Sequence, residues 1–139
     1  MNNSDDLFLS DELLLLRDQI RRFMRDHVKP IEDKLPYNAT GCTAEDRRKL
    51  KAIAEEMGLT RLTVPEEYGG NQVSCLMRVV IAEESAKCRL GAYAPALGAF
   101  GGGPPNIIWS GTDEQIQKYG IPCVEGNKRA FVAITEPTG

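Results

Sequence analysis

The 139-residue sequence has no long apolar run, since its longest aliphatic stretch is the four leucines at positions 13–16. A membrane-spanning helix needs roughly 20 apolar residues, so no transmembrane segment is expected. The opening residues are polar and acidic, which favours neither a secretory signal nor an Arg-rich transit peptide. We therefore expect a cytoplasmic protein that does not insert into membranes.

Histidine and clustered cysteine are also scarce. His27 is the only histidine, and Cys42, Cys75, Cys88 and Cys123 include no C-x-x-C pair. This spacing argues against a zinc site, and without an export signal the thiols are expected to be reduced. His27 lies near the end of a predicted helix, where a surface or capping role is favoured over catalysis.

Charge of one sign is not in excess either. The chain carries 17 Lys and Arg against 20 Asp and Glu, for a formal charge of -3, and 42% of its residues are hydrophobic. That balance is typical of a soluble globular domain and argues against intrinsic disorder. Mild acidity argues against nucleic acid or an anionic membrane as the main partner.

The first predicted helix follows Ser10, whose hydroxyl is suited to cap it. Pro30 and Pro36 bound its end, with one further turn over 31–35 after a kink. Its apolar residues recur at helical spacing and form one stripe. They are Leu13, Leu16, Ile20, Phe23 and Met24.

A second helix is predicted to start at Thr43, with Asp46 three residues later, and to end at Gly58 in a left-handed conformation. Its expected inward residues are Leu50, Ile53, Ala54 and Met57.

The third helix is expected to open at Asn71 or Ser74 and to end before Gly91. Glu83 falls on its apolar face, which indicates a buried and paired carboxylate. The other residues predicted to point inward are Leu76, Val79, Val80 and Ala86.

The elements predicted for the rest of the chain are shorter. We expect a short buried helix after residue 92, a break at Gly101–Gly103 and a helical turn over 106–109. Thr112 and Gln115 form a capping box that predicts a helix to about Tyr119, stopped by Gly120 and Pro122. Residues 129–135 are rich in Phe, Val and Ile and read as the single strand.

The glycine run 101–103 does not match a phosphate-binding loop, because no Lys-Ser/Thr follows it and Asn106 replaces the last glycine of G-x-G-x-x-G. Two interpretations of the glycine run remain: it breaks the helix, or it leaves space for a ligand to approach the backbone closely. The spacing of the carboxylates does not indicate a pair that acts in general acid–base catalysis. Most of them are expected on solvent-exposed helix faces or at helix ends. They are Glu66, Glu67, Glu83 and Glu84.

The last predicted element is a strand that ends in Thr135-Glu136-Pro137. Such a corner exposes backbone N–H groups that can bind a planar heteroaromatic ligand or an anion, although strand corners are common.

Three motifs in register resemble the acyl-CoA dehydrogenases. They are Val64-Pro-Glu-Glu-Tyr-Gly-Gly70, Gly111-Thr-x-x-Gln-x-x-Lys-Tyr119 and Ala133-Ile-Thr-Glu-Pro-Thr-Gly139. The resemblance covers the whole chain, which corresponds to the first third of a typical member. It implies a mainly α fold, the amino-terminal helical domain of that family over 1–126, ending in the first strand of the middle β-domain over 127–139.

What the resemblance implies about function is an FAD-dependent enzyme that converts an acyl-CoA thioester to a 2-enoyl-CoA. Val132, Ile134, Thr135 and Gly139 would then bind the flavin. Leu97 and Phe100 would form a wall of the acyl pocket, where the adjoining glycines and prolines are unusual. Electron-transferring flavoprotein is the implied electron acceptor, and members are commonly dimers or tetramers.

Two rival interpretations stay open. Flavin monooxygenases and nitroalkane oxidases share the three-domain architecture, and a helical module could instead serve in binding or assembly. The Tyr119-Gly120-Ile121-Pro122 segment departs by one residue from the family's Tyr-Leu-Pro. The catalytic glutamate base and the Gly-Ser-Asp that usually follows the last motif are missing, so we expect a truncation that is inactive alone.

Overall fold

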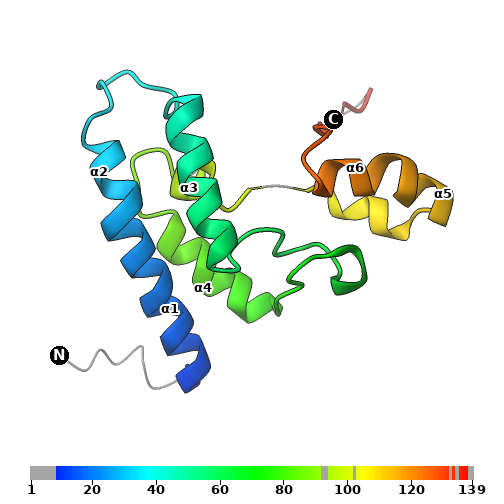
Figure 1. The fold of residues 1–139 in the computed structure, drawn as a ribbon, viewed down its shortest axis with the longest axis horizontal. Coiled ribbons are helices and arrows are strands. Elements are labelled where there is room, and N and C mark those ends of the chain that lie inside the picture. Colours follow the sequence, from blue (N-terminus) through cyan, green and yellow to red (C-terminus); the bar gives the residue numbers. More distant parts are fainter. Residues whose placement is uncertain (1–8, 92–93, 102, 132, 134, 138–139) are drawn as a thin grey trace. The chain divides into compact units, whose positions relative to one another are not determined.

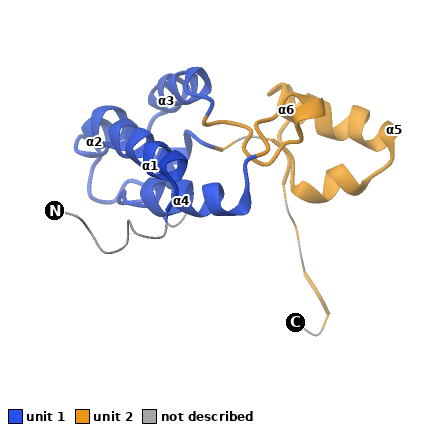
Figure 2. Ribbon diagram, turned by 90° about the horizontal axis from the view of Figure 1, so that it is seen from below, with its two compact units in different colours: residues 1–58, 73–100 blue, residues 59–72, 101–139 orange. Residues whose placement is uncertain are grey.

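The computed structural model describes residues 9–91, 94–101, 103–131, 133 and 135–137, and the described residues form helices and connecting turns but no strand (Figure 1). The chain divides into two compact units. Unit 1 comprises Met1–Gly58 and Val73–Phe100, and unit 2 comprises Leu59–Gln72 and Gly101–Gly139 (Figure 2).

Unit 1 begins with the helix α1 (Asp11–Phe23), which starts as the sequence predicts. The Ser10 hydroxyl accepts a hydrogen bond from the Leu13 backbone N–H at 3.4 Å, and acidic residues occupy the first turn, where the helix dipole favours them. Leu13, Ile20 and Phe23 are buried, whereas the other two predicted stripe residues are half-buried.

Pro30 does not end this helix, contrary to the prediction. A π-helical turn, η2 (Met24–Val28), continues α1 directly into α2 (Lys29–Glu32). The Lys29 N–H donates to the Met24 carbonyl five residues back, so the helix widens just before a residue that has no N–H to donate. The chain therefore runs as one long helical rod from Asp11 to Glu32 (Figure 1).

The helices α3 (Ala44–Glu56) and α4 (Cys75–Ser85) complete the main packing of unit 1. Their N-caps are the predicted Thr43 and Ser74, which accept backbone hydrogen bonds at 3.0 and 3.2 Å. Gly58 has the expected left-handed conformation, with φ of +70°. Helix α4 lies against α1, and the fully buried core includes Phe23, Ile20, Leu50, Val28, Ala54 and Leu97.

The face of α4 that points inward differs from the prediction. Leu76 and Val79 remain 50% and 55% exposed and Ala86 is exposed, while Val80 is buried as expected. The buried neighbours of Val80 are Ile81, Glu84 and Ser85. Helix α4 is apolar on two sides, so its periodicity alone does not determine which side packs against α1.

Unit 1 ends in the 3₁₀ turn η4 (Pro95–Gly98), whose backbone is unusual. Ala96 and Leu97 have φ of +50° and +54°, and Gly98 continues with +86°. Left-handed conformations cost non-glycine residues roughly 1 kcal/mol or more each, so the surrounding packing must hold this turn in place. Both Ala96 and Leu97 are buried.

Unit 2 contains the short turns η3 (Glu66–Tyr68) and η5 (Asn106–Ser110), followed by α5 (Asp113–Gln115), the π turn η6 (Ile116–Gly120) and α6 (Ile121–Val124). The capping box of Thr112 and Gln115 is present with both of its hydrogen bonds. The Tyr68 and Trp109 rings stack with centroids 5.1 Å apart.

The last helix of unit 2 also runs past the predicted end at Tyr119. The Ile121 N–H donates to the Ile116 carbonyl, which places a π turn immediately before Pro122, as at Pro30 in unit 1. In both places the wider turn accommodates a proline that an α-helix interior would exclude.

The predicted strand over 129–135 is not formed in the residues of that segment that the structure describes. A strand is defined by hydrogen bonds to a partner, and the described part of the chain supplies none. Arg129, Ala130, Phe131, Ala133 and Thr135 are all exposed.

Candidate functional site

The residues expected to bind a flavin belong to the terminal segment of the sequence. Thr135 is exposed, and Val132, Ile134 and Gly139 fall outside the described residues. The described residues from Arg129 to Pro137 are all exposed.

The residues expected to line an acyl pocket lie in and just after the left-handed turn of unit 1. Leu97 is 1% exposed, and its carbonyl accepts a hydrogen bond from the Cys42 thiol at 3.7 Å. Phe100 is half-buried, and its ring centroid lies 5.0 Å from that of the buried Phe23. Of the two predicted residues, only Phe100 keeps part of its surface free within unit 1.

His27 completes this aromatic group. The centroid of its ring lies 5.5 Å from that of the Phe23 ring. No group of three or more His, Cys, Asp and Glu in the described residues is arranged to hold a metal ion. The contact that the structure shows for His27 is its packing against Phe23.

Gly103 of the glycine run lies at a bend in unit 2. Gly103 has φ of +99°, and a Cβ there would lie 3.1 Å from the Val64 side chain. The conformation and the close approach both account for glycine at this position.

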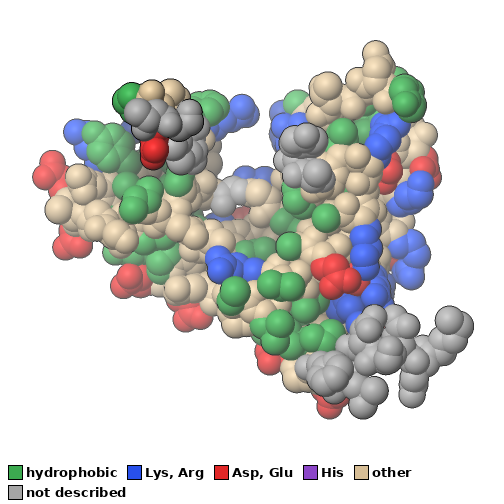
Figure 3. Space-filling model, turned by 180° about the vertical axis from the view of Figure 1, so that it is seen from behind, with side chains coloured by type: hydrophobic (Ala, Val, Ile, Leu, Met, Phe, Trp, Pro, Cys, Tyr) green, Lys and Arg blue, Asp and Glu red, His purple; other side chains and the backbone are tan. Residues whose placement is uncertain are grey.

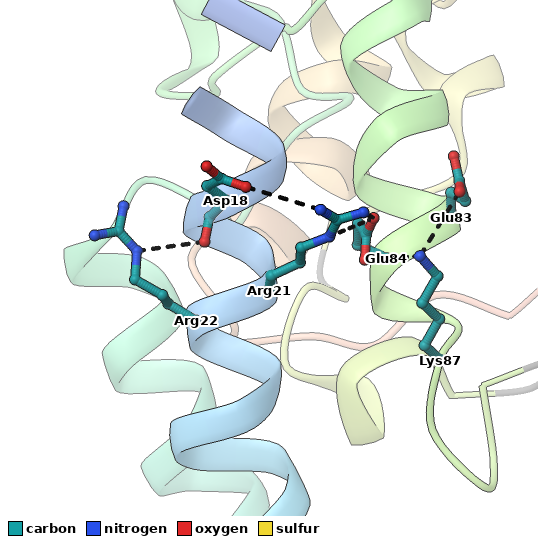
Figure 4. Close-up of polar contacts among 6 residues, drawn as sticks. All are labelled: Asp18, Arg21, Arg22, Glu83, Glu84 and Lys87. Carbon is teal, nitrogen blue, oxygen red and sulfur yellow. Dashed lines mark hydrogen bonds and ion pairs between the residues drawn. The ribbon is translucent and has the colours of Figure 1, made fainter. Parts of the chain in front are cut away.

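The buried carboxylate of α4 is Glu84 and not Glu83, which corrects the prediction. The side chain of Glu84 is 3% exposed, whereas that of Glu83 is 66% exposed and lies 3.7 Å from Lys87. Glu84 receives hydrogen bonds from Arg21 of α1 at 2.9 and 2.8 Å and pairs with Lys87 at 2.9 Å (Figure 4). Its place one turn after Val80 and Ile81 was the sequence signal that could have identified it.

The electrostatics of Glu84 follow from this geometry. Burial by itself would raise the pKa of the carboxyl, but the hydrogen bonds and charges of Arg21 and Lys87 outweigh it, so the pKa lies below the ordinary glutamate value. Both oxygens are engaged, which leaves the carboxylate no role as a free base. It ties α4 to α1.

A shallow groove of about 260 Å³ runs beside this ion cluster in unit 1. Met24 and Val28 give it an apolar part, and Arg25 and Lys29 at its edge pair with Asp26 and Asp33. The remaining lining residues are Arg21, Glu32, Glu84 and Lys87. The four cations that line the groove, Arg21, Arg25, Lys29 and Lys87, are each paired with a carboxylate.

No helix in the part of the chain that the structure describes is long and apolar enough to cross a membrane. Apolar side chains nevertheless reach the surface among charged ones, as Figure 3 shows for one face.

The fold is that of a helical domain with capped helices and an exposed terminal segment. Residues 10–127 match the model of the family described as "Acyl-CoA dehydrogenase, N-terminal domain". The match covers most of the sequence, and the chain belongs to this family.

The related proteins are named as dehydrogenases and as reductases. The chain is 29% identical to a 3-(aryl)acrylate reductase of Clostridium sporogenes, with 94% of this chain and 33% of that protein covered. It is 32% identical to a (2S)-methylsuccinyl-CoA dehydrogenase of Cereibacter sphaeroides, with 93% and 23% covered. It is 32% identical to a subunit of a caffeyl-CoA reductase-Etf complex of Acetobacterium woodii, with 85% and 31% covered.

The chain thus spans about a third or less of the length of these relatives. No solved structure matches it significantly.

Proposed function

We propose that this chain is the amino-terminal part of an FAD-dependent acyl-CoA dehydrogenase that oxidises an acyl-CoA thioester to a 2-enoyl-CoA. The observation that carries the proposal is the family match over residues 10–127, together with the dehydrogenases among the relatives. FAD, when bound, accepts a hydride from the substrate, and the protein orients and tunes it.

In this proposal residues 1–126 form the helical domain and residues 127–139 begin the β-domain. Val132, Ile134, Thr135 and Gly139 contact the flavin ring. The support is the exposure of Thr135 and of the other described residues from Arg129 to Pro137.

The substrate side of the proposal lies in unit 1. Phe100, held against the buried Phe23, offers its free surface to the acyl chain, and Leu97 fixes the turn from which Phe100 extends. The catalytic base comes from outside residues 1–139.

The partners proposed for the whole protein are the acyl-CoA substrate, an electron-transferring flavoprotein and further copies of itself in a dimer or tetramer, in the cytoplasm. One relative is named as a subunit of a reductase-Etf complex, which supports the electron-transfer partner.

A second candidate is the same chemistry in the reductive direction. Relatives named as reductases of arylacrylate, caffeyl-CoA and acryloyl-CoA favour it. With the intact protein, acyl-CoA plus an artificial electron acceptor tests oxidation, and enoyl-CoA plus an electron donor tests reduction. Oxygen-dependent product formation would instead indicate a monooxygenase or nitroalkane oxidase.

The flavin contact is tested by Thr135→Ala in the intact protein. We expect flavin bound per protein, measured from the visible absorbance, to fall several-fold, because the threonine is proposed to hydrogen-bond the ring. Thr40→Ala, an exposed threonine of unit 1, is the control and should leave occupancy unchanged. Equal occupancy and an identical flavin spectrum in both variants would refute the contact.

A further inference from the structure

Three aromatic rings of unit 1 are in contact through the ring of Phe23. The Phe23 centroid lies 5.5 Å from that of His27 and 5.0 Å from that of Phe100, and the ring planes are tilted by 54° and 41°. Both distances fall in the range of roughly 4.5–7 Å in which aromatic pairs attract each other. Phe23 is 1% exposed, whereas His27 and Phe100 are half-buried. Phe100 therefore extends an aromatic surface from the core toward solvent.

This contact stands out because aromatic residues are few and the rest of the core of unit 1 is aliphatic. Phe, Trp and Tyr together make up 6% of the sequence. The other large hydrophobic side chains of unit 1 that are fully buried are Ile20, Val28, Leu50 and Leu97. An aliphatic residue at position 100 would close the core beside Phe23 equally well, so the ring there indicates a role beyond packing.

The backbone that carries Phe100 is held in place. Ala99, directly before it, is fully buried, and so is Leu97, whose carbonyl accepts a hydrogen bond from the Cys42 thiol at 3.7 Å. Contact with the buried Phe23 ring restricts the Phe100 side chain as well. A surface that is fixed before binding costs little entropy to order when a ligand arrives.

The neighbours of Phe100 along the chain leave its ring accessible. Gly98 and Gly101, two residues before it and one after it, have no side chains that could cover the ring, and Gly101 is exposed. Phe23 is the ring neighbour of Phe100 among the residues that the structure describes. The free part of the Phe100 ring is thus available to a ligand.

A fixed aromatic surface distinguishes aryl ligands from alkyl ones. Any apolar surface attracts an alkyl chain in proportion to the area that is buried. A second ring gains an additional attraction, because the negative face of one ring meets the positive edge of the other. A flexible alkyl chain also loses more conformational freedom on binding than a rigid ring does. We expect these effects to favour the aryl ligand by about two- to tenfold in affinity.

We propose that Phe100, held against Phe23, selects acyl-CoA thioesters whose acyl group carries an aryl ring over alkyl thioesters of similar length. The inference rests on the proposed function, in which Phe100 belongs to the wall of the acyl pocket. The simplest such substrate is 3-phenylpropanoyl-CoA, which has one α and one β carbon between the thioester and the ring. Heptanoyl-CoA is an alkyl thioester of similar length.

The affinity of the intact protein for the two enoyl products tests this selection. The oxidised protein does not oxidise 3-phenylacrylyl-CoA or 2-heptenoyl-CoA further at the α and β carbons, so isothermal titration calorimetry measures binding without turnover. We expect the aryl product to bind about two- to tenfold more tightly than the alkyl product. Equal affinities, or tighter binding of the alkyl product, would overturn the proposal without the use of any variant.

A matched pair of variants assigns the preference to the Phe100 ring. Phe100→Leu keeps an apolar side chain but removes the ring, and we expect the ratio of the two affinities to fall toward one. Tyr37→Leu makes a similar change at a ring that is 97% exposed elsewhere in unit 1, and the ratio should stay at its wild-type value. An unchanged ratio in Phe100→Leu would assign the preference to another residue and overturn the proposal.

Turnover of the two saturated thioesters with an artificial electron acceptor separates this proposal from the proposed function. A protein that oxidises heptanoyl-CoA but binds both products equally overturns the aryl selection alone. A protein that binds the aryl product selectively but oxidises neither thioester supports the aryl selection and overturns the proposed oxidation.

Discussion

Removal of the Glu84 carboxylate should destabilise unit 1. Its carboxylate is buried and accepts from Arg21 and Lys87, whereas Glu83 beside it is exposed. At neutral pH we expect Glu84→Gln to lower the free energy of unfolding by about 1–3 kcal/mol, because charged hydrogen bonds are lost. Glu83→Gln is the control and should stay within about 0.5 kcal/mol, as measured by urea denaturation.

The pH dependence of this effect has a defined sign. Because the folded-state pKa of Glu84 lies below its ordinary value, its stabilising contribution is full above the unfolded-state pKa and is lost as pH falls through the folded one. Glutamate in an unfolded chain titrates near about 4.3. The difference between wild type and Glu84→Gln should therefore shrink below about pH 4, and a constant difference down to pH 2 would contradict the assignment.

The left-handed turn at Ala96 gives a second prediction for single residues. Ala96→Gly and Ala99→Gly each remove a buried methyl group, but Ala96 has φ of +50° and Ala99 has φ of −63°. Glycine relieves the backbone cost only at position 96. We expect the Ala96→Gly protein to be more stable than the Ala99→Gly protein by about 1 kcal/mol in denaturant unfolding. The reverse order would be inconsistent with the turn.

Among the elements, the helix that runs from Asp113 to Val124 depends on its first residues. It begins with a capping box and contains a π turn and a proline, so it has few regular internal hydrogen bonds. Thr112→Ala should cost about 1 kcal/mol, and hydrogen exchange should accelerate at the amides of Gln115 and Ile116. Ser110→Ala, exposed and outside the cap, should leave both rates unchanged.

For the whole molecule, the terminal segment is the expected site of first cleavage. In the 139-residue chain, Arg129 is exposed and lies outside any helix, whereas Arg48 and Lys49 lie within α3. Trypsin should therefore cut after Arg129 before it cuts in α3, and in the intact protein the same bond should resist if the segment joins a sheet. Earlier cleavage in α3, read by mass spectrometry, would contradict this order.

The sequence by itself determined where the helices begin and to which family the chain belongs. Ser10, Thr43, Ser74 and Thr112 were all predictable N-caps, because each accepts a hydrogen bond from a backbone N–H only three residues away. The family motifs are likewise short stretches whose residues can be read in order, and the family match confirms the recognition.

Tertiary packing decided what lies beyond that local range. It selected Glu84 over Glu83 and left Val79 exposed, because α4 is apolar on two sides and only contact with α1 decides between them. It also fixed the left-handed turn at Leu97 through burial of the surrounding side chains. The strand predicted over 129–135 is not formed in the described residues, because a strand needs a hydrogen-bonded partner and local sequence alone does not supply one.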